Sequence, residues 1–130
     1  IVIDTGHVGQ HTPESSYDGG YAANALVLIN PIILETSGQP LEAEEGCLSL
    51  PKLGVKVSRS DDILVRYQNN NGDFIEQRFV GFVATIVQHE IDHLNGITLL
   101  KYASRLKRKL FLNKMSKLNR KIKESQNGKR

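Results

Sequence analysis

The sequence contains a single cysteine, Cys47, and few aromatic residues, which make up 6% of the chain. One thiol cannot form an internal disulfide, so we expect a reducing compartment and a chemical role for this residue. No apolar run approaches the roughly 18–20 residues that cross a bilayer, and no basic-then-apolar leader opens the chain. We therefore expect no disulfide framework, no membrane span and no signal peptide.

The length of 130 residues leaves room for one modest domain with a single core. Hydrophobic residues make up 39% and charged residues 24%, which is typical of a soluble globular protein. Residues 1–4, with the sequence IVID, read as a buried strand that begins at once, without an initiator methionine. We therefore expect residues 1–130 to form one domain whose N-terminal portion lies upstream of Ile1.

Charge is distributed unevenly along the chain. Residues 101–130 carry 12 Lys/Arg and one acid, Glu124, which gives +11. Residues 1–100 carry 5 Lys/Arg and 13 Asp/Glu, which gives −8 and accounts for the net charge of +3. A basic end on an acidic body indicates contact with an anionic surface; the alternative is a solvated lysine face with no partner.

Apolar periodicity predicts mainly strands up to residue 80 and helices beyond it. The expected strands and extended segments are residues 1–4, 26–34, 45–51, 55–59, 63–67 and 74–80. Because Asn71-Gly72 tolerates positive φ, residues 63–80 are expected to form a β-hairpin. Residues 5–24 are rich in Gly and Ser and predict a loop.

A buried helix is expected from about Gly81 to a stop at Gly96. A second helix, from about Ser104 to Lys123, is basic and amphipathic. Its apolar stripe consists of Leu110, Phe111, Met115, Leu118 and Ile122. The expected fold class is α+β, with small antiparallel sheets packed around the first helix and the basic helix at the C-terminal end.

The segment QHEIDHLNG, residues 88–96, places two histidines on one side of the first helix. His89 and His93 differ by about 40° around the helix axis, so both imidazoles can bind one cation. Glu90 lies beside that direction and is better placed to contact a water than to bind the cation. This is the H-E-x-x-H pattern of metal hydrolases; the alternative is a solvent-facing cluster without a metal.

A catalytic metal site usually has three protein ligands and an open position, so a third ligand is needed. No histidine follows His93, and the only later acid is Glu124. The third ligand must therefore lie upstream, where His7, His11 and Cys47 are the candidates. Surface histidines and an inert packed cysteine are the alternatives for these residues, although a thiolate is a strong, soft ligand.

The pair of motifs EGCLSLP, at 45–51, and QHEIDHLNG resembles peptide deformylase. The resemblance extends over nearly the whole chain. It implies a metal-dependent amidohydrolase that removes the formyl group from N-formylmethionyl nascent peptides and releases formate. The family's first motif, G-x-G-L-A-A-x-Q, has no match here, because Gln10 follows Gly9 on the wrong side of the first strand. Either the motif lies upstream, which we favour, or the protein lacks that glutamine.

The resemblance also implies roles for individual residues. Cys47, His89 and His93 would bind the metal, with water as the fourth ligand. Glu90 would act as general base and acid, and the backbone N–H of Leu48 would donate to the oxyanion. The implied ion is Fe²⁺, with Zn²⁺, Ni²⁺ or Co²⁺ as substitutes, although two imidazoles and a thiolate also suit zinc.

Four further residues are candidates for binding substrate. Phe82 and Ile86 lie one and two turns before the ligands and could line an apolar slot for the methionine side chain; core packing is the alternative. Glu45 and Gly46 could contact the substrate backbone. Asp92 points away from the His89/His93 direction and is expected to be a surface or supporting residue.

The expected partners and setting follow from the same resemblance. We expect a monomer in the bacterial cytoplasm or an organelle, acting on formylmethionyl peptides and contacting ribosomal RNA through its basic C-terminal helix. Few aromatics accompany the charge, so sequence-specific RNA recognition is not expected. Two alternative functions stay open: an H-E-x-x-H endopeptidase, and a degenerate relative that binds without turnover.

Overall fold

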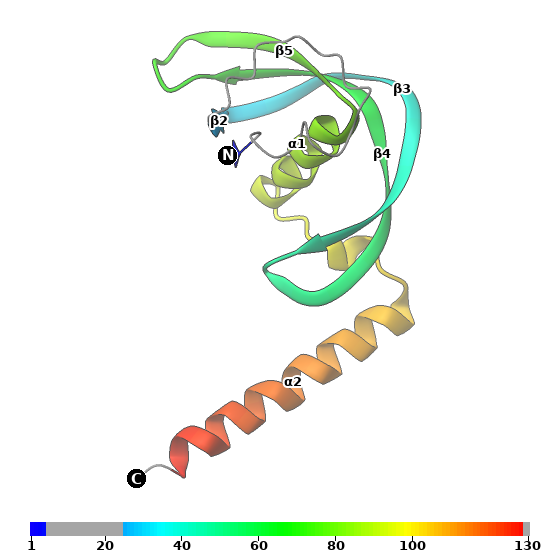
Figure 1. The fold of residues 1–130 in the computed structure, drawn as a ribbon, viewed down its shortest axis with the longest axis vertical. Coiled ribbons are helices and arrows are strands. Elements are labelled where there is room, and N and C mark those ends of the chain that lie inside the picture. Colours follow the sequence, from blue (N-terminus) through cyan, green and yellow to red (C-terminus); the bar gives the residue numbers. More distant parts are fainter. Residues whose placement is uncertain (5–24, 129–130) are drawn as a thin grey trace. The chain divides into compact units, whose positions relative to one another are not determined.

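The computed structural model describes residues 1–4 and 25–128 (Figure 1). It is an α+β structure with small antiparallel sheets and two α-helices, as the sequence predicts. The elements in chain order are β1 (Val2–Asp4), β2 (Ala25–Val27), β3 (Ile29–Cys47), β4 (Leu50–Gln68), β5 (Phe74–Val80), α1 (Gly81–Leu94), the short 3-10 helix η2 (Leu99–Tyr102) and α2 (Arg105–Asn127). The predicted loop at 5–24, with His7 and His11, lies outside the described residues.

The strands form two sheets in the described part of the chain. β1 pairs antiparallel with β2, and β3, β4 and β5 form a second sheet in that order. The predicted hairpin is confirmed, because β4 and β5 pair from Asp62↔Val80 to Gln68↔Phe74. Its turn depends on Gly72, which has a φ of 83°, and on Asn69, whose side-chain oxygen accepts from the backbone N–H groups of Asn71 and Asp73.

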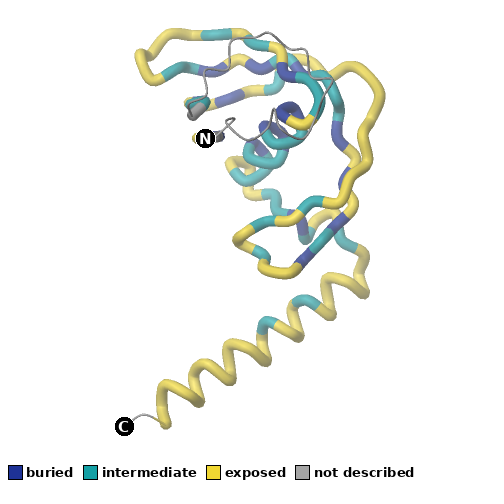
Figure 2. The backbone as a smooth tube through the Cα atoms, in the orientation of Figure 1, coloured by how far each residue is buried: buried dark blue, intermediate teal, exposed yellow. Residues whose placement is uncertain are grey.

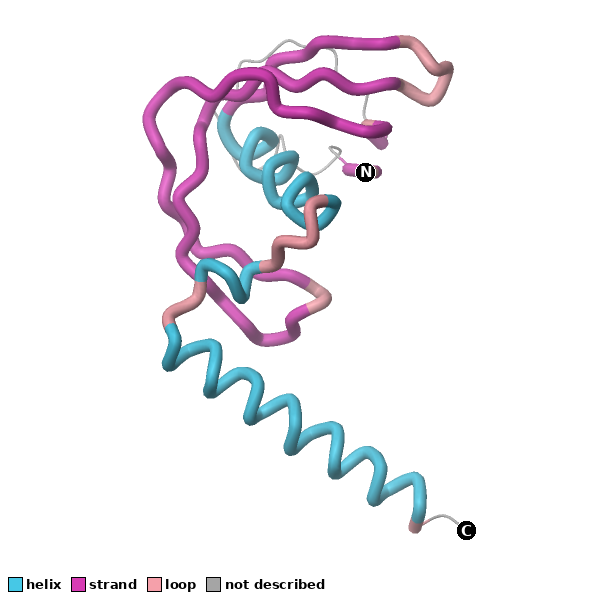
Figure 3. Tube along the Cα trace, turned by 180° about the vertical axis from the view of Figure 1, so that it is seen from behind, coloured by secondary structure: helices cyan, strands magenta, loops and turns pink. Residues whose placement is uncertain are grey.

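The predicted strands at 55–59 and 63–67 are parts of one 19-residue strand, β4. β3 is equally long and continues well past the predicted end at residue 34 (Figure 3). Polar residues interrupt the apolar pattern of both strands, but their backbone groups still pair within the sheet. Strand length here is therefore set by pairing between chain segments more than by the burial of each strand's own side chains.

The chain divides into two compact units. The first consists of Ile1–Ala43 and Ser58–Ile97, and the second of Glu44–Val57 and Thr98–Arg130. The first unit has a core in which β4, β5 and α1 meet around fully buried Phe79. The buried members of this core are Ile3, Leu28, Ile63, Val65, Tyr67, Phe79, Val83, Ala84, Val87 and Ile91.

Helix α1 is held against β4 by polar contacts as well as by its apolar face. The side-chain amide of buried Gln88 donates to the Ser60 carbonyl at 2.7 Å, and its oxygen accepts from the Ser60 N–H at 3.2 Å. Arg59 pairs with Asp92 at 2.7 Å, and the two side chains are only 5% and 20% exposed. These contacts fix the rotation of α1 about its own axis, which decides where its other side chains point.

We expect the change Asp92→Ala to lower the free energy of unfolding by about 3 kcal/mol, because it removes the carboxylate that pairs with the buried Arg59 guanidinium. The measurement is chemical denaturation. The double change Arg59→Met with Asp92→Leu should recover most of the loss, since it removes both charges. Equal destabilisation by the single and double changes would show that the ion pair is not the cause.

The buried hydroxyl of Tyr67 gives the first unit a pH-dependent stability. This hydroxyl donates to the side-chain oxygen of Gln77, and burial raises the pKa of Tyr67 above its ordinary value of 10.0. Above that pH the unfolded chain loses the tyrosine proton before the folded chain does. The free energy of unfolding should therefore fall as the pH rises through this region.

The change Tyr67→Phe should flatten this alkaline loss, as measured by denaturation at several pH values between neutral and strongly alkaline. Tyr102→Phe is the matched control, because Tyr102 is 38% exposed. An equal alkaline loss in wild type and Tyr67→Phe would refute the assignment.

The second unit has a smaller core and carries α2. Its buried residues are Leu53, Val55, Val57 and Leu99, with Phe111 of α2 packed against them. α2 begins after its cap, Ser104, which accepts from the Lys107 N–H, and ends at Asn127, four residues beyond the prediction. None of its residues is buried (Figure 2). No helix in the described part of the chain is long and apolar enough to cross a membrane.

Candidate metal centre

The C-terminal half of α1 carries the two histidines. His89 and His93 lie one turn apart, with 3.1 Å between their Nε2 atoms and an angle of 69° between their rings. Both side chains and that of Glu90 are partly buried. The helix ends as predicted, since Asn95 donates to Ile91 and Gly96 takes a φ of 75°. The predicted convergence of the two imidazoles is therefore confirmed.

Cys47 is the last residue of β3 and is half-buried. It precedes the tight turn at Leu48 and Ser49, where Leu48 is fully exposed. The turn borders a pocket of about 600 Å³, lined by Gly46, Cys47, Leu48, Leu50, Pro51, Lys52, Leu53 and Gly54. Strands enter and leave the turn directly on each side, since β3 ends at Cys47 and β4 begins at Leu50.

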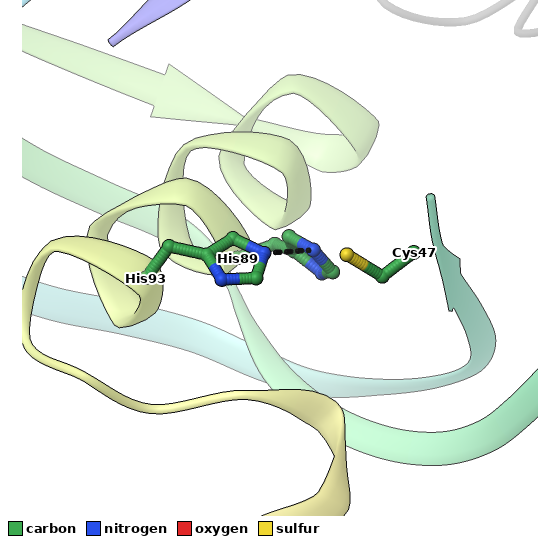
Figure 4. A group of neighbouring side chains, drawn as sticks. All are labelled: Cys47, His89 and His93. Carbon is green, nitrogen blue, oxygen red and sulfur yellow. Dashed lines mark hydrogen bonds between the residues drawn. The ribbon is translucent and has the colours of Figure 1, made fainter. Parts of the chain in front are cut away.

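The described residues include one group of three side chains that could hold a metal ion. The ligand atoms of Cys47, His89 and His93 all lie within 4.8 Å of one another, and the sulfur points toward the imidazoles (Figure 4). Ligands at about 2.0–2.3 Å from one tetrahedral ion lie roughly 3.5 Å apart, so three atoms within 4.8 Å of one another are near enough to converge on one cation. Two nitrogens and a soft thiolate suit a transition metal better than Mg²⁺ or Ca²⁺.

The predicted substrate-binding residues lie in different environments. Glu45 is partly buried and Gly46 is exposed, both near the end of β3. On α1, Phe82 is 53% exposed, so it is not a core residue among those described. Ile86 packs against the core of the first unit, as the core-packing alternative predicts.

Sequence reasoning missed the residues that support the histidine helix. It assigned Asp92 no specific partner, and it gave no role to Gln88, whose side chain binds the backbone of Ser60. The sequence did contain a signal that Arg59 is buried and paired. The alternation of β4 puts Arg59 on the same face as Val55 and Val57, where an unpaired charge would be costly.

An α+β fold with a thiol and two helix-borne imidazoles in one group, and a glutamate directly after the first histidine in the sequence, is typical of metal-dependent hydrolases. The family model described as polypeptide deformylase matches residues 1–109. The chain belongs to this family.

Individual relatives agree with this assignment. A peptide deformylase from Thermotoga petrophila is 43% identical over 98 residues, which cover 75% of this chain and 60% of that protein. The crystal structure of the Ehrlichia chaffeensis peptide deformylase has a TM-score of 0.67 and 39% identity, and covers 73% of this chain and 53% of that one. A Met-Ala-Ser-bound class I type b peptide deformylase from Acinetobacter baumannii has a TM-score of 0.59 and 46% identity, over 62% of this chain and 50% of that one. The chain thus spans about 60% or less of these proteins.

Proposed function

We propose that the protein hydrolyses the N-formyl group of N-formylmethionyl peptides. Water and the formamide give formate and a free α-amine. The observation that carries the proposal is the group of Cys47, His89 and His93, whose ligand atoms lie within 4.8 Å of one another. Family membership supports the reaction type, and the Met-Ala-Ser peptide bound to the Acinetobacter baumannii relative is the kind of product that this reaction releases.

The three side chains would hold one divalent cation. Fe²⁺ is the proposed native ion, and Zn²⁺, Ni²⁺ or Co²⁺ could replace it. When bound, the cation supplies Lewis-acid chemistry, lowering the pKa of a water and polarising the formyl oxygen. The donor set fits this role, because three protein ligands leave a position open for solvent.

Glu90 is the proposed proton carrier. It directly follows His89 on α1 and is partly buried, so it has limited access to bulk water. Its carboxylate would accept the proton of the attacking water and return it to the departing amine. The backbone N–H of Leu48, in the turn after Cys47, would donate to the oxyanion that forms on the formyl oxygen.

Four residues are proposed to contact the substrate. Glu45 and Gly46 are proposed to contact its backbone, and Phe82 and Ile86 to line the slot for its methionine side chain. The exposure of Phe82 leaves its ring accessible to a ligand. A second oxyanion donor, the glutamine of the family's first motif, has no counterpart in this sequence.

A formate-release assay tests the function. Formyl-Met-Ala-Ser should be hydrolysed, whereas acetyl-Met-Ala-Ser, whose acyl group is larger by a methyl, should be hydrolysed far more slowly. Internal cleavage of longer peptides without formate release would favour the endopeptidase alternative. Metal binding without hydrolysis of any of these peptides would favour the degenerate, non-catalytic alternative.

The basic face of α2 is proposed to contact ribosomal RNA phosphates, which suits a monomer acting on nascent chains in the bacterial cytoplasm or an organelle. Replacing Lys107, Arg120 and Lys123 with glutamate should reduce co-pelleting with ribosomes, and rising salt should reduce wild-type co-pelleting steeply. Equal pelleting of wild type and variant would contradict the contact.

A further inference from the structure

The start of β4 and the middle of α2 enclose a second pocket in the second unit. Its volume is about 340 Å³, within the range of about 300–1,000 Å³ that is usual for ligand sites. The lining residues, here called the lysine groove, are Pro51, Lys52, Lys114, Met115, Lys117, Leu118 and Lys121. The groove therefore has three apolar residues and four lysines, with no acidic residue in its wall.

The helical spacing of α2 explains this composition. Phe111, Met115, Leu118 and Ile122 are spaced four, three and four residues apart, so they form one stripe along the helix. Phe111 packs against the core of the second unit, whereas Leu118 and Ile122 are 48% and 47% exposed. The stripe thus starts in the core and continues into the groove and beyond, where its apolar side chains are about half exposed.

The lysines follow one flank of the same stripe. Lys114, Lys117 and Lys121 recur at intervals of three and four residues beside Met115 and Leu118. No described residue forms an ion pair with them or with Lys52, since the ion pair found on α2 joins Arg120 and Glu124. Their ammonium groups are therefore available to an anionic ligand.

The backbone conformation of Lys52 indicates independently that the start of β4 is specialised. Its φ is 61°, a left-handed conformation that residues with a side chain seldom adopt. Such strain persists only where the surrounding structure maintains it, and it is concentrated at functional sites. Here it occurs at the residue where β4 contributes its charge to the groove.

We propose that the lysine groove binds an acidic peptide segment that inserts an apolar side chain between its flanking carboxylates. The four lysines of the groove complement the charge of the peptide carboxylates, and Met115 offers an adaptable surface for an apolar side chain. RNA phosphates would pair with these lysines but would leave Pro51, Met115 and Leu118 exposed. The groove wall has no aromatic residue on which a base could stack.

The test uses two labelled peptides of about 15 residues, long enough for about four helical turns. One alternates leucines and glutamates at helical spacing, and the other has serine in place of every leucine. In fluorescence anisotropy at near-physiological salt, the leucine peptide should bind about tenfold more tightly or better, a difference of about 1.4 kcal/mol. The change Leu118→Glu should remove this preference.

Matched variants distinguish binding in the groove from general attraction to the positive charge of α2. Lys117→Glu, in the groove, should lower the affinity for the leucine peptide about tenfold. Lys109→Glu, outside the groove, should lower that affinity about twofold or less at this salt concentration. Because Leu118 and the lysines are exposed, these variants should keep the wild-type circular dichroism spectrum.

Three results would overturn the proposal. Equal affinity for the serine peptide, or for a single-stranded RNA oligonucleotide, would show an anion surface without an apolar component. Equal effects of Lys117→Glu and Lys109→Glu would show that the groove is not the site. A concentration-dependent dimer of the wild type that Leu118→Glu abolishes would identify a second copy as the occupant. None of these outcomes depends on the proposed deformylation.

Discussion

The change Glu90→Gln is expected to reduce formate release from formyl-Met-Ala-Ser by about 10²–10⁴-fold, the usual contribution of a general acid–base group. Glutamine has nearly the same size and keeps a hydrogen-bonding oxygen, but it cannot accept the proton of the attacking water. The loss should appear in kcat more than in KM, because proton transfer belongs to the reaction rather than to binding.

Metal content separates this effect from loss of the site. Glu90 is not one of the three candidate ligands, so the Glu90→Gln protein should keep the wild-type stoichiometry by elemental analysis after anaerobic purification. Glu76→Gln, on the exposed side of β5, is the matched control and should keep full activity. A Glu90→Gln protein with full metal and near wild-type kcat would exclude Glu90 as the proton carrier.

The change His93→Ala is expected to abolish both metal retention and hydrolysis. It leaves one imidazole and one thiolate, fewer than the three protein ligands that catalytic sites commonly have. Elemental analysis should show the metal falling from one equivalent to near zero, and activity should fall to background. The side chain is only partly buried, so circular dichroism should still show a folded protein.

Adding back metal distinguishes loss of affinity from loss of fold. Excess Co²⁺ or Ni²⁺ should restore little activity to His93→Ala, whereas it should restore metal-stripped wild type. A folded His93→Ala protein that retains a full equivalent of metal would show that this histidine is not a ligand.

The local parts of the fold were predictable because their signals are local. The hairpin followed from Asn71-Gly72 between alternating segments, and α1 followed from a change of period that Gly96 ends. The full lengths of β3 and β4 were not predicted. In β4, inward-facing and outward-facing positions alternate without a break from Val57 through Asp61 to Ile63. The sequence therefore contained a signal for one long strand, but polar residues at inward-facing positions concealed it.

The polar middle of β3 had no comparable signal. Residues 35–44 are mostly exposed, and they form a strand because their backbone pairs with a neighbouring strand. This segment contains Gly38, and the reason for a glycine at that position is evident only from the fold. Gly38 has a φ of 76°, and a side chain at this position would collide with the carboxylate of Asp61.

The site was partly predictable for the same reason. His89 and His93 share a helix, so their spacing alone predicted their convergence. Spacing left Cys47, His7 and His11 as candidates for the third ligand. The soft thiolate of Cys47 favoured that residue, and the resemblance to deformylases then selected it. Among the described residues Cys47 is the one grouped with the histidine pair, while His7 and His11 lie outside them.

The most direct test is the absorption spectrum of the Co²⁺-substituted protein. If Cys47 binds the same ion as the two histidines, wild type should show a thiolate-to-cobalt charge-transfer band in the near ultraviolet together with the visible bands of a four-coordinate ion. The change Cys47→Ser should remove the charge-transfer band. A Co²⁺ spectrum without that band in wild type, or an identical spectrum in Cys47→Ser, would contradict a metal centre built from this cysteine and the histidine pair.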